Sequence, residues 1–476
     1  MSNQKQMCPV AGKCGGCQIL NMDYPRQLSF KQAKVIKLLG KFCHVKEIIG
    51  MEHPFHYRNK VQAAFGTTRG GQIISGVYQS GSHRIVKVDS CLLEDEKADT
   101  IIVTVRKLLK GFKLTAYNEF NRTGFLRHVL VKRAFATGEV MVVLVSATPM
   151  FPGKNSFVSA LLKAHPEITT IIHNVNDRFT SLVLGERQTV LYGDGYITDV
   201  LCGLKFRISA QSFYQINPVQ TEILYNTAME YAQLTGNETV VDAYCGVGTI
   251  GMVAAKTAGT VVGVESNPQA VKDAIVNAKI NDMKNIRFVC ADATEFLCEA
   301  AENGEHCDVL LMDPPRAGST PQFIDAAAKL APDRIVYVSC NPETLARDLH
   351  LFIKKGYAVK KIQPVDMFPH TDHTETVVLL SKGEVDSKKI RVEFSLEDMD
   401  MSEFQDGATY PQIKEYVLEH TGLKVSNLYI SQIKRKCGIE VGKNYNLPKS
   451  EDSRQPQCPP EKEKAIREAF KYFGMI

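Results

Sequence analysis

A cysteine at the junction of a strand and a helix is the residue in this sequence best placed for chemistry. Cys340 follows the apolar run 334–338, which predicts a buried strand. Asn341 can cap a helix whose first residue is Pro342, a favoured position for proline. Because the amino end of a helix carries partial positive charge, we expect it to favour the thiolate, the nucleophilic form. A lone cysteine is more often structural, so the prediction depends on its companions.

A glycine-rich turn in the same half of the chain predicts a nucleotide-cofactor site. Residues 240–251 have the pattern of a strand, a tight turn and a helix start, and glycines let the backbone approach a ligand. Glu265 ends the next apolar run, about 20 residues on, where an acidic residue holds ribose hydroxyls. With Asp242 before the turn, the pattern fits S-adenosylmethionine better than a dinucleotide. The alternative is an ordinary strand-to-helix turn.

Two carboxylates stand at the ends of further apolar strands. Asp313 ends the run 310–312 and would point into the crevice at the carboxyl edge of a parallel sheet, where a uracil or amino group needs an oriented partner. Glu375 begins the last apolar strand, and beside a cysteine nucleophile it can act as a general base. Alone, each would be a loop-capping or solvated residue. His370 and His373 have no convergent partner, so we interpret them as polar loop residues.

Three cysteines near the amino terminus predict a metal or cluster site. Cys8, Cys14 and Cys17 are separated by five residues and then two, with glycines that let the backbone wrap. Disulfides are disfavoured, because no signal peptide is visible and the 13 cysteines are scattered through an enzyme-like chain. Thiolates suit zinc or an iron–sulfur cluster, and the spacing is not that of radical S-adenosylmethionine enzymes. Cys43 and Cys91 both remain candidates for the fourth ligand.

These motifs, in this order, resemble the RNA uracil-5-methyltransferase family, whose members make 5-methyluridine in bacterial 23S ribosomal RNA or in transfer RNA. The resemblance covers about residues 7–382 and rests on Ser-Cys-Asn-Pro at 339–342 with His-Thr-Glu at 373–375. It implies that Cys340 attacks C6 of the uracil, that C5 takes the methyl group, and that Glu375 removes the C5 proton. Covalent addition also makes chemical sense, because uracil C5 is too weak a nucleophile for direct methyl transfer.

The resemblance also assigns binding residues and partners. It selects Cys91 to complete a [4Fe-4S] site with Cys8, Cys14 and Cys17, with zinc as the alternative, and we expect a structural or RNA-shaping role without a redox step. It favours 23S ribosomal RNA over transfer RNA as the substrate, with Asp313 holding the uracil edge. Contacts to S-adenosylmethionine are implied for Gln215, Tyr244, Thr249, Glu265, Asp292 and Asp313.

The elements that position these residues predict an α/β protein of three parts. Residues 1–209 would form a β-rich α+β central domain that carries the cluster and binds RNA, with the helix at 23–44 packing on the catalytic domain. Alternating strands and helices over 210–382 predict a doubly wound, Rossmann-like class I methyltransferase domain that ends in an antiparallel hairpin. Residues 384–476 predict a small helical extension, possessing helices at 410–420, 427–436 and 461–473, with a helix-turn-helix-like pattern.

Composition and charge leave the partners open. Hydrophobic content is 44% and net charge +5, ordinary values that do not by themselves indicate nucleic-acid binding. No apolar run has membrane length, so we expect the cytoplasm. Only six residues precede Met7, so we expect the amino-terminal RNA-binding β-barrel of many family members to be absent. We also expect a monomer. The partner of the extension is not identified. A basic and aromatic cluster is predicted to track phosphates and stack an extruded base: Arg122, Arg127, Lys132 and Arg133 around Phe125 and His128.

Three other functions compete with 23S ribosomal RNA methylation. The first is the same chemistry on transfer RNA. The second is an amino-methyltransferase that uses Asp313-Pro314-Pro315, which would need no nucleophile and would survive replacement of Cys340 by alanine. The third is an RNA chaperone with a silent pocket, which would not bind S-adenosylmethionine.

Overall fold

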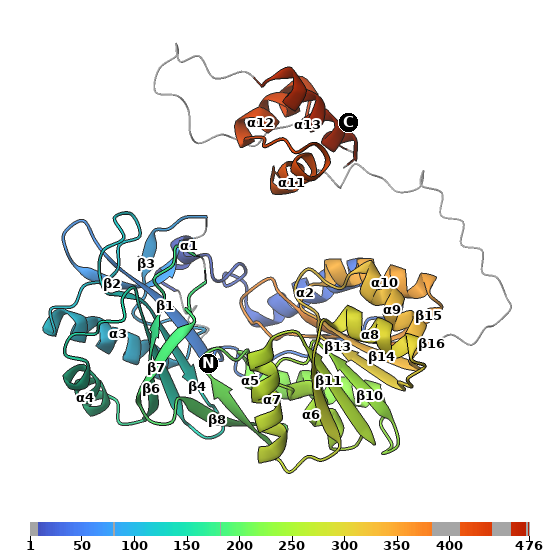
Figure 1. Cartoon of the computed structure of the whole chain (residues 1–476), viewed down its shortest axis with the longest axis horizontal. Helices are drawn as coiled ribbons and strands as arrows, with labels where there is room; N and C mark the ends of the chain where they lie inside the picture. Colours follow the sequence, from blue (N-terminus) through green and yellow to red (C-terminus); the bar gives the residue numbers. More distant parts are fainter. Residues whose placement is uncertain are drawn as a thin grey trace. The chain divides into compact units, whose positions relative to one another are not determined.

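The computed structural model describes residues 8–79, 81–180, 182–382, 410–439, 458–472 and 475 of the 476-residue chain. The chain divides into two compact units, Met1–Val385 and Asp386–Ile476, and each is described by itself (Figure 1). The first unit contains two seven-stranded sheets and a two-stranded hairpin. The second is helical in its described part.

The sheet of the catalytic half has the strand order β12-β11-β10-β13-β14-β16-β15. Its first five strands are parallel, and β16 lies antiparallel between β14 and β15. This order confirms the predicted doubly wound sheet with an antiparallel end. The strands are β10 (Thr239–Ala243), β11 (Thr260–Glu265), β12 (Ile286–Cys290), β13 (Val309–Met312), β14 (Arg334–Ser339), β15 (Tyr357–Val365) and β16 (Glu375–Lys382).

Helices cover both faces of this sheet, as its strands require. Alternate residues of β10 point to opposite faces, so that Val240 lies in one hydrophobic core and Val241 in the other. The core of Val240 contains residues of α5 (Pro218–Ala232), α6 (Thr249–Ala255) and α7 (Pro268–Ile280). The core of Val241 contains residues of α2 (Tyr24–Leu39), α8 (Ala293–Glu302), α9 (Pro321–Leu330) and α10 (Pro342–Lys354).

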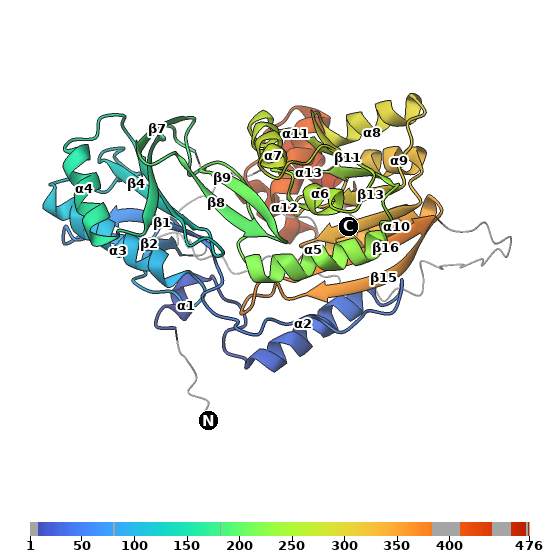
Figure 2. The ribbon, with the colours of Figure 1, turned by 90° about the horizontal axis from the view of Figure 1, so that it is seen from below.

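Helix α2 is separated from the catalytic half in sequence but packs on its sheet. Figure 2 shows α2 running along β15, and its Val35 and Leu39 are fully buried against the core on that face. An apolar stripe on an otherwise polar helix has to face another element, which explains why this helix docks there. A short helix, α1 (Ala11–Cys14), lies ahead of it within the cysteine segment.

The other seven-stranded sheet has the order β3-β2-β1-β4-β5-β6-β7, antiparallel except for the β5–β6 pair. One face packs on α3 (Glu96–Gly111) and α4 (Lys154–Ala164) in a separate hydrophobic core. The strands are β1 (Lys60–Thr67), β2 (Ile73–Tyr78), β3 (Ile85–Lys87), β4 (Leu126–Arg133), β5 (Val140–Ser146), β6 (Ile168–Val175) and β7 (Arg187–Tyr192).

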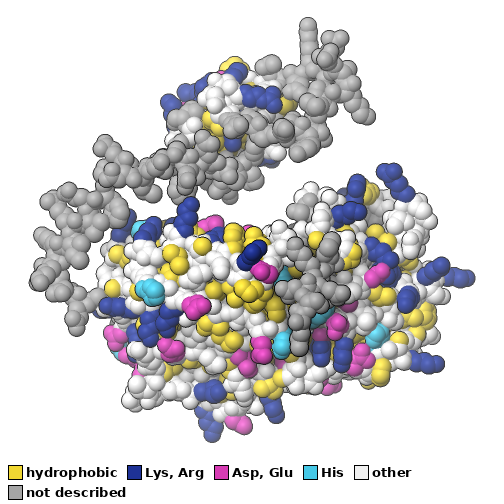
Figure 3. All heavy atoms as spheres, turned by 180° about the vertical axis from the view of Figure 1, so that it is seen from behind, with side chains coloured by type: hydrophobic (Ala, Val, Ile, Leu, Met, Phe, Trp, Pro, Cys, Tyr) yellow, Lys and Arg dark blue, Asp and Glu magenta, His cyan; other side chains and the backbone are white. Residues whose placement is uncertain are grey.

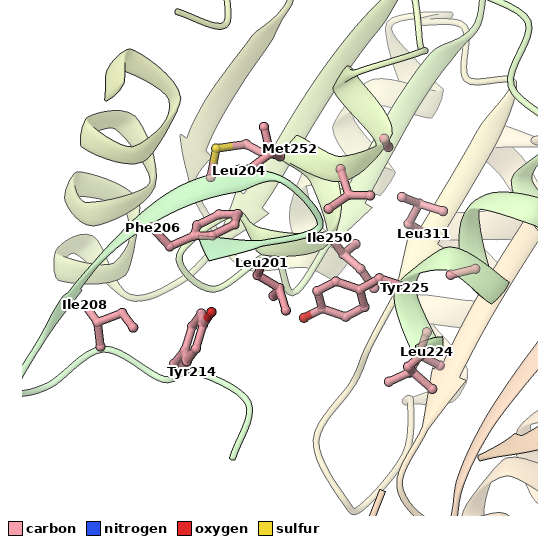
Figure 4. Packing of buried hydrophobic residues seen from close by; sticks show 14 of the residues in the cluster. Leu201, Leu204, Phe206, Ile208, Tyr214, Leu224, Tyr225, Ile250, Met252 and Leu311 are labelled. Atoms are coloured by element: carbon pink, nitrogen blue, oxygen red, sulfur yellow. The ribbon is translucent and has the colours of Figure 1, made fainter. Parts of the chain in front are cut away.

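The hairpin of β8 (Tyr196–Leu201) and β9 (Leu204–Ser209) joins the two sheets into one unit. Figure 4 shows its Leu201 beside Tyr225 of α5 and Ile250 of α6, and Phe206 belongs to the same core. The same core includes Met141 and other residues on the second face of the β-rich sheet. The β-rich sheet and the doubly wound sheet therefore share one continuous hydrophobic core, and the β8–β9 hairpin is packed within it.

The second unit has its own small core. Its helices are α11 (Tyr410–Thr421), α12 (Asn427–Lys436) and α13 (Pro460–Tyr472), and the buried residues Val417, Ile433 and Phe470 bring all three together. Gly422 has a φ of +68°, and the Ser426 hydroxyl accepts from Tyr429 N as the α12 cap. The helix-turn-helix interpretation of α11 and α12 stays a prediction. The predicted segments 384–409 and 440–457 lie outside the described residues.

Charge is mixed over the surface. On the face in Figure 3, Lys and Arg side chains are interspersed with Asp and Glu. Within the described ranges, the search for a helix long and apolar enough to cross a bilayer finds none.

Candidate active site at the carboxyl edge of the parallel sheet

Strand register places Cys340 and Glu375 side by side. Ser339 of β14 pairs with Thr376 of β16 in an antiparallel ladder. Cys340 is the next residue after Ser339 and Glu375 is the residue before Thr376, so both adjoin the last pair of the ladder. The Glu375 carboxylate is close enough to raise the pKa of the Cys340 thiol.

The remaining predicted residues follow the same edge in the order of the strands. Met312 of β13 pairs with Ala243 of β10 and with Tyr337 of β14, so Asp313 lies between the Tyr244 turn and Cys340. Glu265 ends β11, and Asp292 follows β12. The change of direction in strand order falls between β10 and β13, the place where open α/β sheets bind ligands.

The resting state of Cys340 differs from the expected one. The side chain is half-buried, and its pKa is raised to about 11 by burial, by Glu375 and by Asp313, against the opposing charge of Arg316. Asn341 does cap α10, accepting from Glu343 N at 3.0 Å. The raised pKa is contrary to the predicted stabilised thiolate, because that prediction considered the helix end without the burial of the thiol and without the two neighbouring carboxyl groups.

The two carboxyl groups also hold protons more tightly than usual. Burial raises the pKa of Asp313 to about 7. Glu375 is 4% exposed, and burial together with the nearby Asp313 raises its pKa well above the ordinary value. Two carboxyl groups in one low-dielectric site disfavour each other's ionised form. The pair is therefore poised to carry protons at neutral pH, as acid–base chemistry requires.

A cavity of about 190 Å³ adjoins this edge, and five of the six predicted cofactor residues line it: Gln215, Tyr244, Thr249, Glu265 and Asp313. Asp292 is exposed and does not line it; its carboxylate caps α8 by accepting from Thr294 N and Glu295 N. The cavity also reaches Asp242, Tyr225 and Phe213.

Backbone geometry explains the glycine turn that forms one wall. Gly246 has a φ of +56°, and its N–H donates to a Glu265 carboxylate oxygen at 3.1 Å. The other Glu265 oxygen accepts from Asn267 N at 2.7 Å. A Cβ on Gly251 would lie 2.6 Å from an Asp242 carboxylate oxygen, so only glycine lets α6 approach that buried acid.

Two residues of this cavity were missed in the sequence. The Tyr225 hydroxyl lies 2.9 Å from the Thr249 hydroxyl and fixes the start of α6 from α5. Phe213 is 63% exposed at the cavity, two residues before Gln215. The closeness of Phe213 to Gln215 is visible in the sequence, whereas the exposure of Phe213 and the Tyr225 contact depend on the fold.

The four predicted cluster ligands come together from two segments. Cys8, Cys14, Cys17 and Cys91 line one cavity of about 80 Å³, which also has apolar walls. Cys43 is elsewhere, with its Sγ 3.2 Å from the Lys360 carbonyl. Among the described residues, no three His, Cys, Asp or Glu side chains are arranged as a finished metal site.

The predicted basic cluster is a structural feature. Phe125 is buried in a core, and Arg127, His128 and Lys132 are 5–6% exposed. Arg127 donates to the Asn176 and Arg178 carbonyls, and Lys132 donates to the Ser209 and Ser212 carbonyls at 2.8 Å. Arg133 pairs with Asp95. Only exposed Arg122 is available to a phosphate, so the expectation of an RNA track here was wrong.

His370 also differs from its interpretation as a polar loop residue. It is 3% exposed and has a φ of +69°, a conformation unusual for a residue with a side chain. Its ring stacks on Phe55, with centroids 4.6 Å apart. His373 remains partly exposed and lies 3.1 Å from an Arg316 nitrogen.

Comparison with known proteins agrees with this arrangement. The tRNA (uracil-5-)-methyltransferase family model matches residues 182–383. An RNA methyltransferase of Bacillus cereus is 42% identical over 382 residues, 79% of this chain and 83% of that protein. One from Halalkalibacterium halodurans is 43% identical over 378 residues, 78% of this chain and 82% of that one.

A solved structure extends the likeness to the fold. The tRNA (uracil-54, C5)-methyltransferase of Pyrococcus abyssi, in complex with S-adenosyl-L-homocysteine, superposes with a TM-score of 0.65 at 29% identity. The match covers 77% of this chain and 85% of that one. The chain therefore belongs to the RNA uracil-5-methyltransferase family and is an S-adenosylmethionine-dependent RNA methyltransferase.

Proposed function

We propose that this enzyme methylates C5 of a uridine in 23S ribosomal RNA, with Cys340 as nucleophile and Glu375 as base. The observation that supports the proposal is the register of β14 and β16, whose last pair, Ser339 with Thr376, adjoins both residues. Asp313 and the cofactor cavity adjoin them on the same edge. An amino-methyltransferase would have no use for this pair.

The reaction has three steps on this geometry. The Cys340 thiol loses its proton to solvent, its sulfur bonds to uracil C6, and the electron pair displaced from the C5–C6 double bond makes C5 nucleophilic. C5 then takes the methyl group of S-adenosylmethionine, which leaves as S-adenosylhomocysteine. Glu375 finally removes the C5 proton, the C5–C6 double bond returns, and the Cys340 thiolate is expelled.

Asp313 has a different role in this proposal. It is half-buried between the cofactor cavity and Cys340, and with a pKa raised to about 7 it is available in protonated or ionised form. A carboxyl group so placed can hydrogen-bond the edge of the uracil and select that base. Gln215, Tyr244, Thr249 and Glu265 would surround the cofactor, and Asp292 would reach it only from the exposed rim.

Labelled S-adenosylmethionine tests the chemistry directly. The full chain and Cys340→Ala would be incubated with unmodified 23S ribosomal RNA and, separately, transfer RNA, and the labelled nucleoside identified after digestion. We expect label in 5-methyluridine that is lost in Cys340→Ala. Label in an amino group, or undiminished label in the variant, would exclude the covalent mechanism.

Transfer RNA is the second candidate substrate. The Pyrococcus abyssi relative acts on transfer RNA according to its description, and its fold is shared over most of both chains. The same assay decides between the two, because only the true substrate will accept about one methyl group per target uridine. We place the activity in the cytoplasm, with the enzyme as a monomer.

We also propose that Cys8, Cys14, Cys17 and Cys91 hold a [4Fe-4S] cluster. Four thiols on one cavity supply the donor set that such a cluster takes, and the apolar walls shield it from water. When bound, the cluster would cross-link the amino-terminal segment to the loop of Cys91 and contribute to folding.

Metal and sulfide analysis of anaerobically purified protein tests the cluster. We expect about four iron and four sulfide per chain, a loss in Cys91→Ala, and no change in the control Cys43→Ala. One zinc without sulfide would support a tetrahedral zinc site instead.

RNA contacts are proposed on a groove of the β-rich half. The groove has a volume of about 880 Å³ and includes Phe120, which is 94% exposed. Exposed aromatic rings beside cationic side chains suit stacked bases and phosphates. Its relevant lining residues are Arg69, Tyr78, His83, Arg84, Tyr117 and Phe120.

A further inference from the structure

The segment that leads to Glu375 is held by buried side chains from outside the methyltransferase domain. Residues 366–374 connect β15 to β16 and end next to the proposed base. Glu375 is the first residue of its strand, so its position depends on this segment as well as on the sheet. The amino-terminal helix α2 and the residue Tyr57 supply much of the support.

Lys31 of α2 makes the strongest of these contacts. Its ammonium lies 2.5 Å from an Asp366 carboxylate oxygen, and both side chains are fully buried. The same ammonium donates to the Phe368 carbonyl at 3.0 Å. The second Asp366 oxygen accepts from the Tyr24 hydroxyl at 2.9 Å. A buried ammonium needs several partners of this kind, and here they all belong to or adjoin the segment.

Three further residues, Tyr57, Gln27 and Ile19, add four contacts to the segment. The Tyr57 hydroxyl donates to the Pro369 carbonyl at 3.0 Å. The Gln27 side chain accepts from His370 N at 2.9 Å, and its amide nitrogen lies 3.0 Å from His370 Nδ1. Ile19 N donates to the His370 carbonyl at 3.2 Å. These bonds tie both backbone groups of His370 and hold its unusual positive φ.

We infer that Lys31 and Tyr57 are positioning residues for proton removal by Glu375. The inference rests on the proposed function and adds a role that no cofactor or RNA contact gives these side chains. They touch the segment rather than the reacting atoms, and neither lines the S-adenosylmethionine cavity. Tyr57 also contacts Arg58 and packs beside Cys17 and Cys91, which line the proposed cluster cavity. Weakening them should therefore slow the last step, while cofactor binding and sulfur addition continue.

Slow proton removal has a distinctive product. If methyl transfer precedes it, the methylated uracil stays bonded to Cys340 through C6, and a protein–RNA adduct accumulates that survives denaturing gels. The measurement is the adduct fraction in single-turnover reactions with the full chain, together with kcat and the Kd for S-adenosylmethionine.

Tyr57→Phe removes one hydroxyl, with its contacts to the Pro369 carbonyl and to Arg58, and keeps the ring. Its matched control is Tyr357→Phe, which deletes a buried tyrosine hydroxyl that donates to the Pro332 carbonyl at 2.9 Å, remote from Glu375 in the sheet. We expect Tyr57→Phe to lower kcat about tenfold, with more adduct and an unchanged cofactor Kd. Tyr357→Phe should keep the wild-type adduct fraction and kcat.

Lys31→Met tests the ion pair, with Arg26→Met as its control. Arg26 lies on the same helix in an ion pair with Asp23, 3.6 Å long and exposed. Lys31→Met should increase the adduct more than Tyr57→Phe does, and Arg26→Met should not change it. If Lys31→Met does not fold, the comparison of Tyr57→Phe with Tyr357→Phe is sufficient to test the positioning role.

Glu375→Gln separates failure of this inference from failure of the proposed function. Adduct in Glu375→Gln but none above wild type in Tyr57→Phe, or equal changes in both tyrosine variants, would overturn the positioning role. No adduct in Glu375→Gln or in any other variant would overturn the covalent mechanism and the inference with it.

Discussion

The two seven-stranded sheets of the first unit use buried polar side chains in opposite ways. In the mostly parallel sheet, Asp313, Cys340 and Glu375 stand where strands end or begin, and the two carboxyl groups raise the pKa of the Cys340 thiol. In the β-rich sheet, Arg127 and Lys132 lie within a strand and donate to backbone carbonyls of nearby loops. The proposed reactive groups therefore lie at the ends of strands, and the polar groups that stabilise the fold lie within a strand.

The energetic consequences differ as well. Like-charged carboxyl groups at the catalytic edge oppose folding at neutral pH, because each is more easily ionised in the unfolded chain. Lys132 stabilises the folded chain through its two hydrogen bonds, although burial lowers its pKa to about 7. Removal of a charged group should therefore raise the free energy of unfolding at the catalytic edge and lower it at Lys132.

The pH dependence of the reaction should show the largest effect. Since the pKa of Cys340 is raised to about 11, the thiolate fraction grows about tenfold per pH unit below that value. We expect kcat/KM to rise by about a thousandfold between pH 6 and 9 where sulfur addition limits the rate. A profile that is flat above pH 7 would indicate the thiolate that the helix end alone predicted.

Lys132→Met should cause the largest loss of stability. It leaves the Ser209 and Ser212 carbonyls without their buried donor, so we expect the free energy of unfolding to fall by roughly 2–4 kcal/mol. Denaturant unfolding measures this, with the exposed neighbour-strand variant Lys205→Met as the control. An unchanged stability with weaker RNA binding would restore the basic cluster as an RNA surface.

Glu375→Gln should stabilise the protein while it blocks turnover. A carboxyl group whose folded pKa is raised contributes stability at low pH that is lost as pH rises through the folded value. For Asp313 this window runs from the ordinary 3.8 to about 7, and Glu375 adds a similar loss above 4.5. Removing one charge should therefore raise the free energy of unfolding by roughly 1–3 kcal/mol at pH 8.

The same variant provides its own control in acid. At pH 5 the folded carboxyl pair of the wild type holds most of its protons, so the advantage of Glu375→Gln should shrink toward zero. Thermal unfolding at the two pH values makes the comparison. A variant that is less stable at pH 8 would show that Glu375 supports the fold as Lys132 does.

Phe120→Ala should have the smallest effect. The ring is 94% exposed and contributes nothing to the core, so stability should not change. Loss of one base stack should raise the KM for RNA about fivefold while the KM for S-adenosylmethionine stays constant. Equal RNA KM values in wild type and variant would remove this groove from the proposed RNA surface.

Sequence patterns predicted the strands and helices of the catalytic sheet well, because each of these elements is encoded by residues that are close together in the sequence. A strand that ends in a polar residue before a helix cap places Cys340 without knowledge of the rest of the chain. The closeness of Cys340 and Glu375 needed the insertion of β16 between β14 and β15. The family resemblance supplied that pairing, and spacing alone could not.

The residues whose environment was predicted wrongly are all covered by segments that are distant in the sequence. Arg127 and Lys132 look like a basic stripe in sequence, since the hairpin and loops that cover them lie about 50 to 80 residues away. The fate of His370 likewise depends on Gln27, which is 343 residues distant. The pKa of Cys340 required the placement of two carboxyl groups from other strands.

The register between β14 and β16 also governs which length changes the enzyme can survive. Loss of one residue within β16 would have one of two results. Either the later pairs shift, and apolar side chains such as Val377 and Val378 turn to the wrong faces, or those pairs are kept and Glu375 is displaced from Cys340 by one residue. Natural variants of this sheet should therefore show insertions and deletions on the far side of its strands, around Lys355 and Gly356, and keep the spacing from Glu375 onward fixed.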